Sequence, residues 1–136
     1  MHETIEDPGT FAGELEDSLE YFTGTQEYHA LGFPFANVVL TDGAKYLAEK
    51  AGAWWLMDVI ASHIPSIKND YMAVAQLKVK GNEASFRLHD GDRGGGERTW
   101  ARQRIPYTDF PLESIMLFVE RDHASGWWVI LLPSEH

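Results

Sequence analysis

Five arginines within 18 residues carry the clearest binding chemistry in the sequence. They are Arg87, Arg93, Arg98, Arg102 and Arg104. Arg102 and Arg104 alternate with Trp100 along a predicted strand, so the three side chains are expected to share one face. Guanidinium groups beside an indole ring can hold an anionic ligand or stack on bases. The same arginines can instead pair with acidic residues of their own chain, which has a net charge of −10.

The segment from Asp90 to Glu97 combines acidic residues with glycines and resembles the opening of a calcium loop. A complete loop needs an oxygen ligand at its fifth position and a bidentate Glu at its twelfth. Those positions hold Gly94 and Ala101. The Gly-Lys-Ser/Thr ending of a phosphate-binding loop is also missing. The composition therefore predicts a flexible hairpin loop, with weak metal binding as the alternative.

Other patterns of catalytic or metal-binding residues are incomplete. The six histidines include no pair four residues apart and no HExxH motif, and the chain has no cysteine. Ser125 lacks the glycine two positions earlier that a nucleophile elbow requires. The sequence therefore predicts a non-enzymatic protein with no catalytic residues, no metal site and no cofactor.

Negative charge is concentrated at the start of the chain. Residues 1–44 contain nine acids and no Lys or Arg, whereas residues 45–136 contain twelve acids and eleven bases. A protein that binds nucleic acid directly is expected to show a basic surface, so this distribution argues against that role. It suits a protein partner with a basic surface, or simple solubility.

Much of this acidity falls on one predicted helix. Apolar side chains recur at helical spacing at Phe11, Leu15, Leu19 and Phe22. Four acids occupy the rest of the helix, and these are Glu14, Glu16, Asp17 and Glu20. The acidic face is either a solvated surface or the surface that binds a partner.

The stretch from Val38 to Ile64 is expected to organise the fold. It contains a short apolar strand and then a Thr41-Asp42-Gly43 turn, where Asp42 can cap a helix that begins at about Gly43. Gly52 predicts a kink or a break between two helices. Pro65 marks the end of the second helix.

Alternating apolar and polar residues predict strands after Pro65. Residues 75–80 and 84–89 form one expected hairpin, and residues 98–105 form another strand. Residues 114–120 and 127–132 form a hairpin that is apolar on both faces, so it should lie at the sheet centre with helices covering it. The predicted fold is α+β, with an antiparallel sheet of five or six strands and two or three helices packed on one face.

The chain is predicted to form a single domain over residues 1–136, with residues 1–9 as a flexible leader. Its N-terminus has acids in place of a basic signal region, and no apolar run approaches membrane length. A soluble, cytoplasmic protein without a membrane partner is therefore expected, and a homodimer is possible.

Four parts of the sequence together resemble an uncharacterised family of small bacterial, plasmid and phage proteins. They are Phe22-Thr23-Gly24-Thr25 with Tyr28-His29, then Leu40–Asp58, Thr108–Leu112 and Leu131–Glu135. The resemblance covers roughly residues 20–135 and implies no activity. Because it does not reach the acidic segment before Tyr21, partner binding through that segment would be particular to this protein.

Two main hypotheses of function follow, with an accessory protein of purely structural, oligomeric role as a third possibility. The first is an acidic protein-binding module of mobile-element origin, which inhibits a host nucleic-acid-processing complex as anti-CRISPR or anti-restriction proteins do. Glu14, Glu16, Asp17 and Glu20 would carry this binding. The alternative is a small ligand-binding or enzymatic domain that uses Trp100, Arg102, Arg104 and the Asp90–Glu97 loop.

Overall fold

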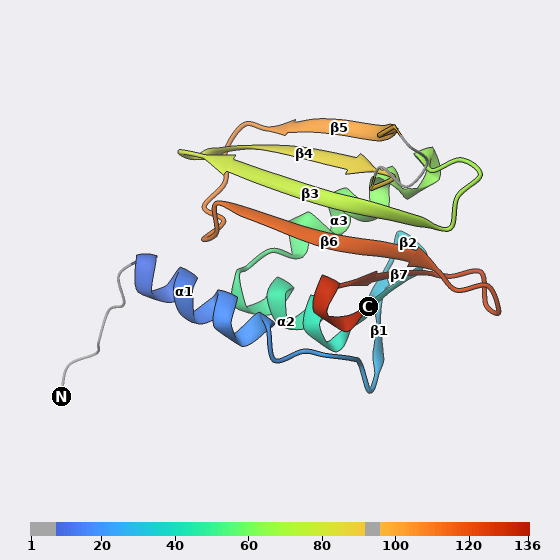
Figure 1. Cartoon of the computed structure of the whole chain (residues 1–136), viewed down its shortest axis with the longest axis horizontal. Helices are drawn as coiled ribbons and strands as arrows, with labels where there is room; N and C mark the ends of the chain where they lie inside the picture. The colour runs from blue at the N-terminus through green and yellow to red at the C-terminus, as the bar shows by residue number, and fades with distance from the viewer. Residues whose placement is uncertain (1–7, 92–95) are drawn as a thin grey trace.

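The computed structural model describes residues 8–91 and 96–136, and within these ranges one mixed sheet packs against helices on one side (Figure 1). The helices are α1 (Pro8–Leu19), α2 (Asp42–Lys50) and α3 (Trp54–His63). The strands are β1 (Tyr28–Gly32), β2 (Phe35–Thr41), β3 (Met72–Lys80), β4 (Glu83–His89), β5 (Thr99–Ile105), β6 (Ser114–Arg121) and β7 (Trp128–Leu131). Short 3-10 helices follow α3 and β7, namely η1 (Ile64–Ser66) and η2 (Pro133–Glu135).

The predicted leader, residues 1–9, falls largely outside the described residues, which begin at residue 8. Pro8 and Gly9 already belong to α1. Proline suits the first turn of a helix, because its missing N–H has no partner there in any case.

The helix that the N-terminal apolar spacing predicts is present as α1, but it ends at Leu19, before Glu20 and Phe22, which were expected to lie on it. Leu15 and Leu19 are buried, and Phe11 is half-buried against the core. Just beyond the helix, the ring of Phe22 packs on the ring of Tyr46 in α2, with centroids 5.1 Å apart. Apolar contacts therefore hold α1 along α2.

The interruption predicted at Gly52 is confirmed as a break between α2 and α3. The Ala53 amide donates to the Ala48 carbonyl at 2.8 Å, and the Gly52 amide donates to the Glu49 carbonyl at 3.4 Å. These two hydrogen bonds form a Schellman motif, which needs a left-handed residue after the helix. Gly52 supplies it with a φ of 60°.

The prediction of a purely antiparallel sheet of five or six strands is wrong. The described residues form seven strands in the order β1-β2-β7-β6-β3-β4-β5, and β2 runs parallel to β7. The expected hairpins β3–β4 and β6–β7 and the strand β5 are present. The added strand is β1, which lies in a segment expected to be a turn-rich connection and pairs with β2.

The parallel pairing of β2 with β7 is explained by the need to bury their apolar side chains. Two successive residues of β2, Val39 and Leu40, are buried on opposite faces, and so are Ile130 and Leu131 of β7. Each strand therefore needs a neighbour and shielded surroundings on both sides. Pairing the two strands satisfies this need although they run in the same direction.

One face of the sheet forms the core with the helices. Alternate strand residues join the buried residues of α1, α2 and α3 in one cluster. Its largest fully buried side chains include Leu40, Leu47, Leu56, Met57, Ile60, Leu77, Phe86, Leu88 and Leu117. The prediction that helices gather on one face is confirmed.

The opposite face carries no α-helix in the described part of the chain. The expected central position of β6 and β7 is confirmed, but helices cover only one of their faces. On the other face, the C-terminal His136 packs edge-on against Phe118, with ring centroids 5.3 Å apart. Farther along β6, Met116 is 42% exposed.

We predict opposite effects of alanine at two glycines. Gly52→Ala should lower the free energy of unfolding by about 1–2 kcal/mol, because a Cβ is unfavourable at positive φ. Apart from its two chain neighbours, no described residue has a heavy atom within 4 Å of that Cβ position, so the cost is conformational. Gly13→Ala lies inside α1 and is equally unobstructed, so it should stabilise by about 0.5–1 kcal/mol. Urea unfolding measures both, and a stabilising Gly52→Ala would contradict the helix ending described here.

Candidate functional site

The four predicted partner-binding acids, Glu14, Glu16, Asp17 and Glu20, are all exposed along α1 and just beyond it. None forms a salt bridge with another described residue. The arginines of β4 and β5 do not neutralise them: Arg87 pairs with Glu97 and Arg104 with Glu83, and Arg102 forms no ion pair with a described residue.

The scaffold beneath this acidic face is ordered. Leu15 and Leu19 are 3% and 7% exposed, and burying each contributes about 1.5–3 kcal/mol. The hydroxyl of Ser134, near the C-terminus, donates to the Leu19 carbonyl at 3.4 Å. Packing therefore fixes the direction in which the carboxylates project.

The predicted strip of Trp100, Arg102 and Arg104 is only partly assembled. Arg102 and Arg104 are exposed on the face of the sheet away from the helices, next to Arg87 and Ser85 of β4. Trp100 packs against the core, beneath the guanidinium of Arg98. Its indole Nε1 is buried and makes no hydrogen bond within the described residues. Trp100 is therefore poorly placed to stack on a ligand beside the two arginines.

The ends of the Asp90–Glu97 loop are held together, whereas residues 92–95, including Gly94, lie outside the described residues. The carboxylate of Asp90 accepts from the Arg98 amide at 3.0 Å, and the Asp90 amide donates to the Arg98 carbonyl at 2.9 Å. Asp90 is 8% exposed. This contact closes a hairpin, which agrees with the loop that the sequence predicts.

The neighbouring His89 lies in surroundings that favour its neutral form. Burial lowers the pKa of His89, and the adjacent Arg87 guanidinium lowers it further. Its Nδ1 accepts from the Gly91 amide at 3.1 Å, so this histidine supports the turn.

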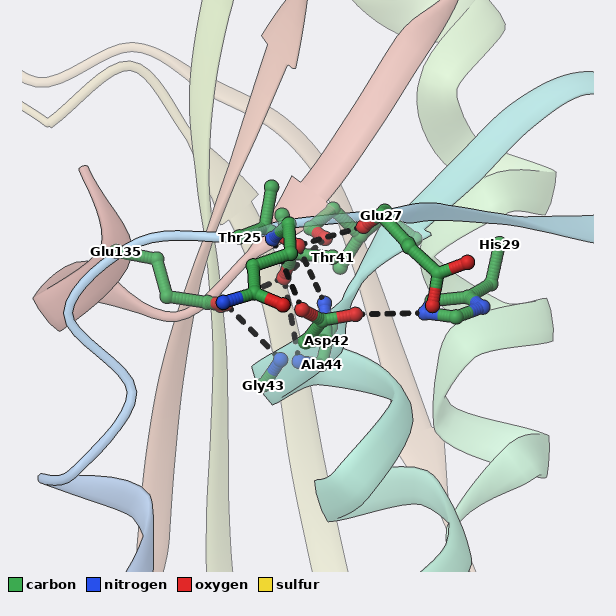
Figure 2. Close-up of polar contacts among 10 residues, drawn as sticks. Thr25, Glu27, His29, Thr41, Asp42, Gly43, Ala44 and Glu135 are labelled. Carbon is green, nitrogen blue, oxygen red and sulfur yellow. Dashed lines mark hydrogen bonds and ion pairs between the residues drawn. The ribbon is translucent and has the colours of Figure 1, made fainter.

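The best-organised polar cluster surrounds the N-terminus of α2, and we call it the α2 junction (Figure 2). Thr41 is the helix cap, and its hydroxyl accepts from the Ala44 amide at 3.3 Å. The carboxylate of Glu135 accepts from the Thr41 hydroxyl at 2.6 Å, the Gly43 amide at 2.9 Å and the Leu132 amide at 2.9 Å. A residue at the C-terminus thus completes the cap of a helix 92 positions earlier.

Asp42 is the first residue of the helix rather than its cap, which corrects the prediction. Its carboxylate turns outward, where it accepts from the Gln26 amide at 3.0 Å and contacts His29 Nε2 at 2.8 Å. The Asp42 amide donates to the Thr25 hydroxyl at 2.9 Å. The hydrogen bond from His29 lowers the pKa of Asp42, and the bond from Gln26 adds to this effect.

The α2 junction leaves no room for a side chain at position 43. A Cβ on Gly43 would lie 2.6 Å from Glu135 Oε1 and 2.6 Å from Leu132 Cδ1. These distances are shorter than any van der Waals contact allows, so a side chain would displace the carboxylate. Glycine thus permits the C-terminal segment to close against the helix.

Glu27, His29 and Asp42 have the composition of a metal site, and their ligand atoms lie within 4.8 Å of one another. Donor atoms around tetrahedral zinc lie roughly 3.3 Å apart when each is about 2.0 Å from the metal. The N-terminus of α2 places partial positive charge beside Asp42, which opposes a cation. Asp42 is also already hydrogen-bonded, so we assign this group a structural role.

Sequence reasoning missed the α2 junction because its members are far apart in the chain. Thr25, His29, Thr41, Asp42 and Glu135 come from three of the four parts on which the family resemblance rests. The Thr-Asp-Gly turn was a usable signal for a cap. No local pattern showed that Glu135 would complete it.

The fold and these surfaces define a class: a small α+β protein with exposed acids along α1 and exposed arginines on the sheet face away from the helices. The chain belongs to a family described as "Family of unknown function (DUF6876)", whose model matches residues 13–136. No curated protein and no solved structure matches the chain. Among the described residues, no helix is both long and apolar enough to cross a membrane.

The extent of the family match corrects one expectation. The match begins at residue 13, so the acidic residues of α1 lie inside the family region. The acidic segment was expected to lie outside the family and to be particular to this protein.

We predict that Gly43 and Glu135 are energetically coupled. Glu135→Ala should cost about 1.5–3 kcal/mol, because it removes charge-assisted hydrogen bonds. Gly43→Ala should also destabilise, because its Cβ displaces the same carboxylate. In the double variant the carboxylate is already gone, so the combined loss should be smaller than the sum by roughly 0.5–3 kcal/mol.

Urea denaturation of the wild type, the two single variants and the double variant measures this coupling. Glu113→Ala removes an exposed acid remote from the junction and should leave stability within about 0.5 kcal/mol of the wild type. Strict additivity of Gly43→Ala and Glu135→Ala would refute the proposed contact.

A pH-dependent contribution from Asp42 is also predicted. Its folded pKa lies below the unfolded value of about 3.9, so its stabilising effect is present above that pH. The effect is lost as the pH falls through the lowered folded value. Asp42→Asn should therefore be less stable than the wild type at pH 7, and the two should converge in strong acid. Asp58→Asn serves as the exposed control, and a stability gap that persists unchanged in acid would contradict the prediction.

Proposed function

We propose that the protein is a non-enzymatic, acidic protein-binding module that docks α1 on a basic surface of its partner. One observation carries this proposal: the carboxylates of Glu14, Glu16, Asp17 and Glu20 are exposed on a packed helix and have no ion-pair partner among the described residues. An acidic face that pairs with no basic residue in the described part of the chain is available to a second protein.

The electrostatic argument supports fast and selective association. Residues 1–44, which include α1, hold nine acids and no Lys or Arg, so this third of the chain has a strong net negative charge. The field of such a charge increases the rate of encounter with a basic surface and repels acidic competitors. The core below α1 already fixes the helix, so little conformational entropy is lost on binding.

A basic surface that normally holds phosphates is the target that we propose. Carboxylates on a rigid helix can occupy a groove of this kind and exclude nucleic acid from it. The mobile-element origin that the family resemblance implies favours a host defence complex as the partner. The protein would then act as an inhibitor of the anti-CRISPR or anti-restriction type.

Charge reversal of the four acids to lysine tests the proposal. The wild-type protein should retain a nucleic-acid-binding protein from host lysate at low salt and release it at about 0.5 M salt, because screening weakens exposed charge pairs. The captured partner should lose binding to its nucleic acid when the wild type is added. The charge-reversed variant should neither retain the partner nor prevent it from binding its nucleic acid.

A matched control changes the net charge equally at other exposed acids, namely Glu49, Asp58, Asp109 and Glu113. This control should keep partner binding if the location of the charge matters. Circular dichroism shows whether both variants remain folded. If the α1 reversal binds as well as the wild type, the acidic face is not the docking surface.

A further inference from the structure

A second surface lies on the sheet face away from the helices, over β3, β4 and β5. It is an open hollow of about 1350 Å³. Five bases and one acid are among the residues that line it, and these are Lys78, Lys80, Arg87, Arg102, Arg104 and Glu83. In a chain with a net charge of −10, this is a local excess of positive charge.

The strand register brings like charges together within this hollow. Arg87 of β4 is directly opposite Arg102 of β5. Like charges in directly opposed positions destabilise a strand pair. Glu97 and Gln76 hold the Arg87 guanidinium, which offsets part of this cost. Arg102 forms no ion pair with a described residue, so its positive charge does not stabilise the pairing of β4 with β5.

Three of the bases remain available to a ligand. Lys78, Lys80 and Arg102 form no ion pair with any residue that the structure describes. Arg104 pairs with Glu83, but its side chain is 72% exposed, and such surface pairs contribute only about 0–1 kcal/mol. An incoming anion can displace Glu83 at little cost.

The position of β5 determines what shape of ligand fits. It is the last strand of the sheet, and Figure 1 shows it along the outer edge. Its central residues Arg102, Gln103 and Arg104 are exposed. An edge strand presents backbone N–H and C=O groups that a further strand can pair with.

We propose that this edge receives an extended acidic peptide segment of a partner protein, which adds to β5 and sets its carboxylates against Arg102 and Arg104. In an added strand, alternate side chains face the hollow, about 6.8 Å apart. Arg102 and Arg104 have the same two-residue spacing. Guanidinium groups bind carboxylates in a two-pronged geometry, so this match favours a peptide with acids at every second position.

A single-stranded nucleic acid fits this surface less well. Proteins that bind single-stranded nucleic acid without sequence preference stack its nucleobases on aromatic side chains. The aromatic residue among those that line the hollow is Phe86, which is 2% exposed. The overall charge of −10 also repels a long polyanion more strongly than a short acidic segment.

The same charges make the edge selective. A neutral or basic strand that approached β5 would bury or face the unpaired Arg102 without compensation, which disfavours it. Arg102 and Arg104 thereby protect the edge against indiscriminate pairing and admit an acidic segment.

Fluorescence anisotropy with three labelled probes tests the proposal at 50 mM NaCl. The probes are a ten-residue peptide that alternates Thr and Glu, one that alternates Thr and Lys, and a ten-nucleotide thymidine oligomer. The Thr/Glu peptide should bind, and the double variant Arg102→Glu/Arg104→Glu should weaken it by about tenfold or more. Lys45→Glu/Lys68→Glu makes the same charge change outside the hollow and should bind the peptide as the wild type does.

Hydrogen exchange locates the bound peptide. Amides of residues 99–105 should exchange more slowly in the complex, because an added strand pairs with them. Binding without this protection would overturn strand addition. Preferential binding of the thymidine oligomer, or binding that the β5 variant leaves unchanged, would overturn the acidic-peptide assignment. Because these variants leave α1 intact, the outcome is independent of the partner-binding role proposed for that helix.

Discussion

The contact on which the structure depends is the carboxylate of Glu135 at the N-terminus of α2. It satisfies the Gly43 amide and the Thr41 hydroxyl at the end of β2, and the Leu132 amide just after β7. These two strands are the parallel pair, so their carboxyl ends lie side by side. The buried apolar strands β2 and β7 need this parallel arrangement, which brings polar groups together at one edge of the sheet. The Glu135 carboxylate accepts hydrogen bonds from those groups. The first and last thirds of the chain are joined there.

The arrangement of the helices then determines which surfaces are available. The largest buried cluster lies between one sheet face and the helices, so α1 can display its acids without disturbing the sheet. The other sheet face is left to the short C-terminal segment over its central strands and to solvent over β3, β4 and β5. Charge is segregated accordingly, with carboxylates along α1 and bases near the β5 edge. The two surfaces suit partners of opposite charge.

Sequence reasoning succeeded where the determining interactions are local. The spacing of Leu15 and Leu19 predicts α1, and Gly52 predicts the break after α2, because both effects act within a few residues.

Sequence reasoning failed where a distant segment decides the outcome. β1 carries no apolar alternation of its own and becomes a strand through pairing with β2. The local pattern favours Asp42 as the cap, because nothing nearby in the sequence shows that Thr25, Gln26 and His29 form hydrogen bonds with its polar groups. Trp100 was placed beside Arg102 by strict alternation, whereas the ladder is irregular between Leu88 and His89, directly across from it.

Native-state hydrogen exchange of two amides tests the central contact most directly. The amides of Gly43 and Leu132 both donate to Glu135, although they are far apart in sequence. If this carboxylate joins the two ends of the fold, both amides should exchange only through global unfolding, with the same free energy of opening. Glu135→Gln should lower that free energy for both together. A Gly43 amide that exchanges as fast as an unstructured peptide while the core stays protected would contradict the account.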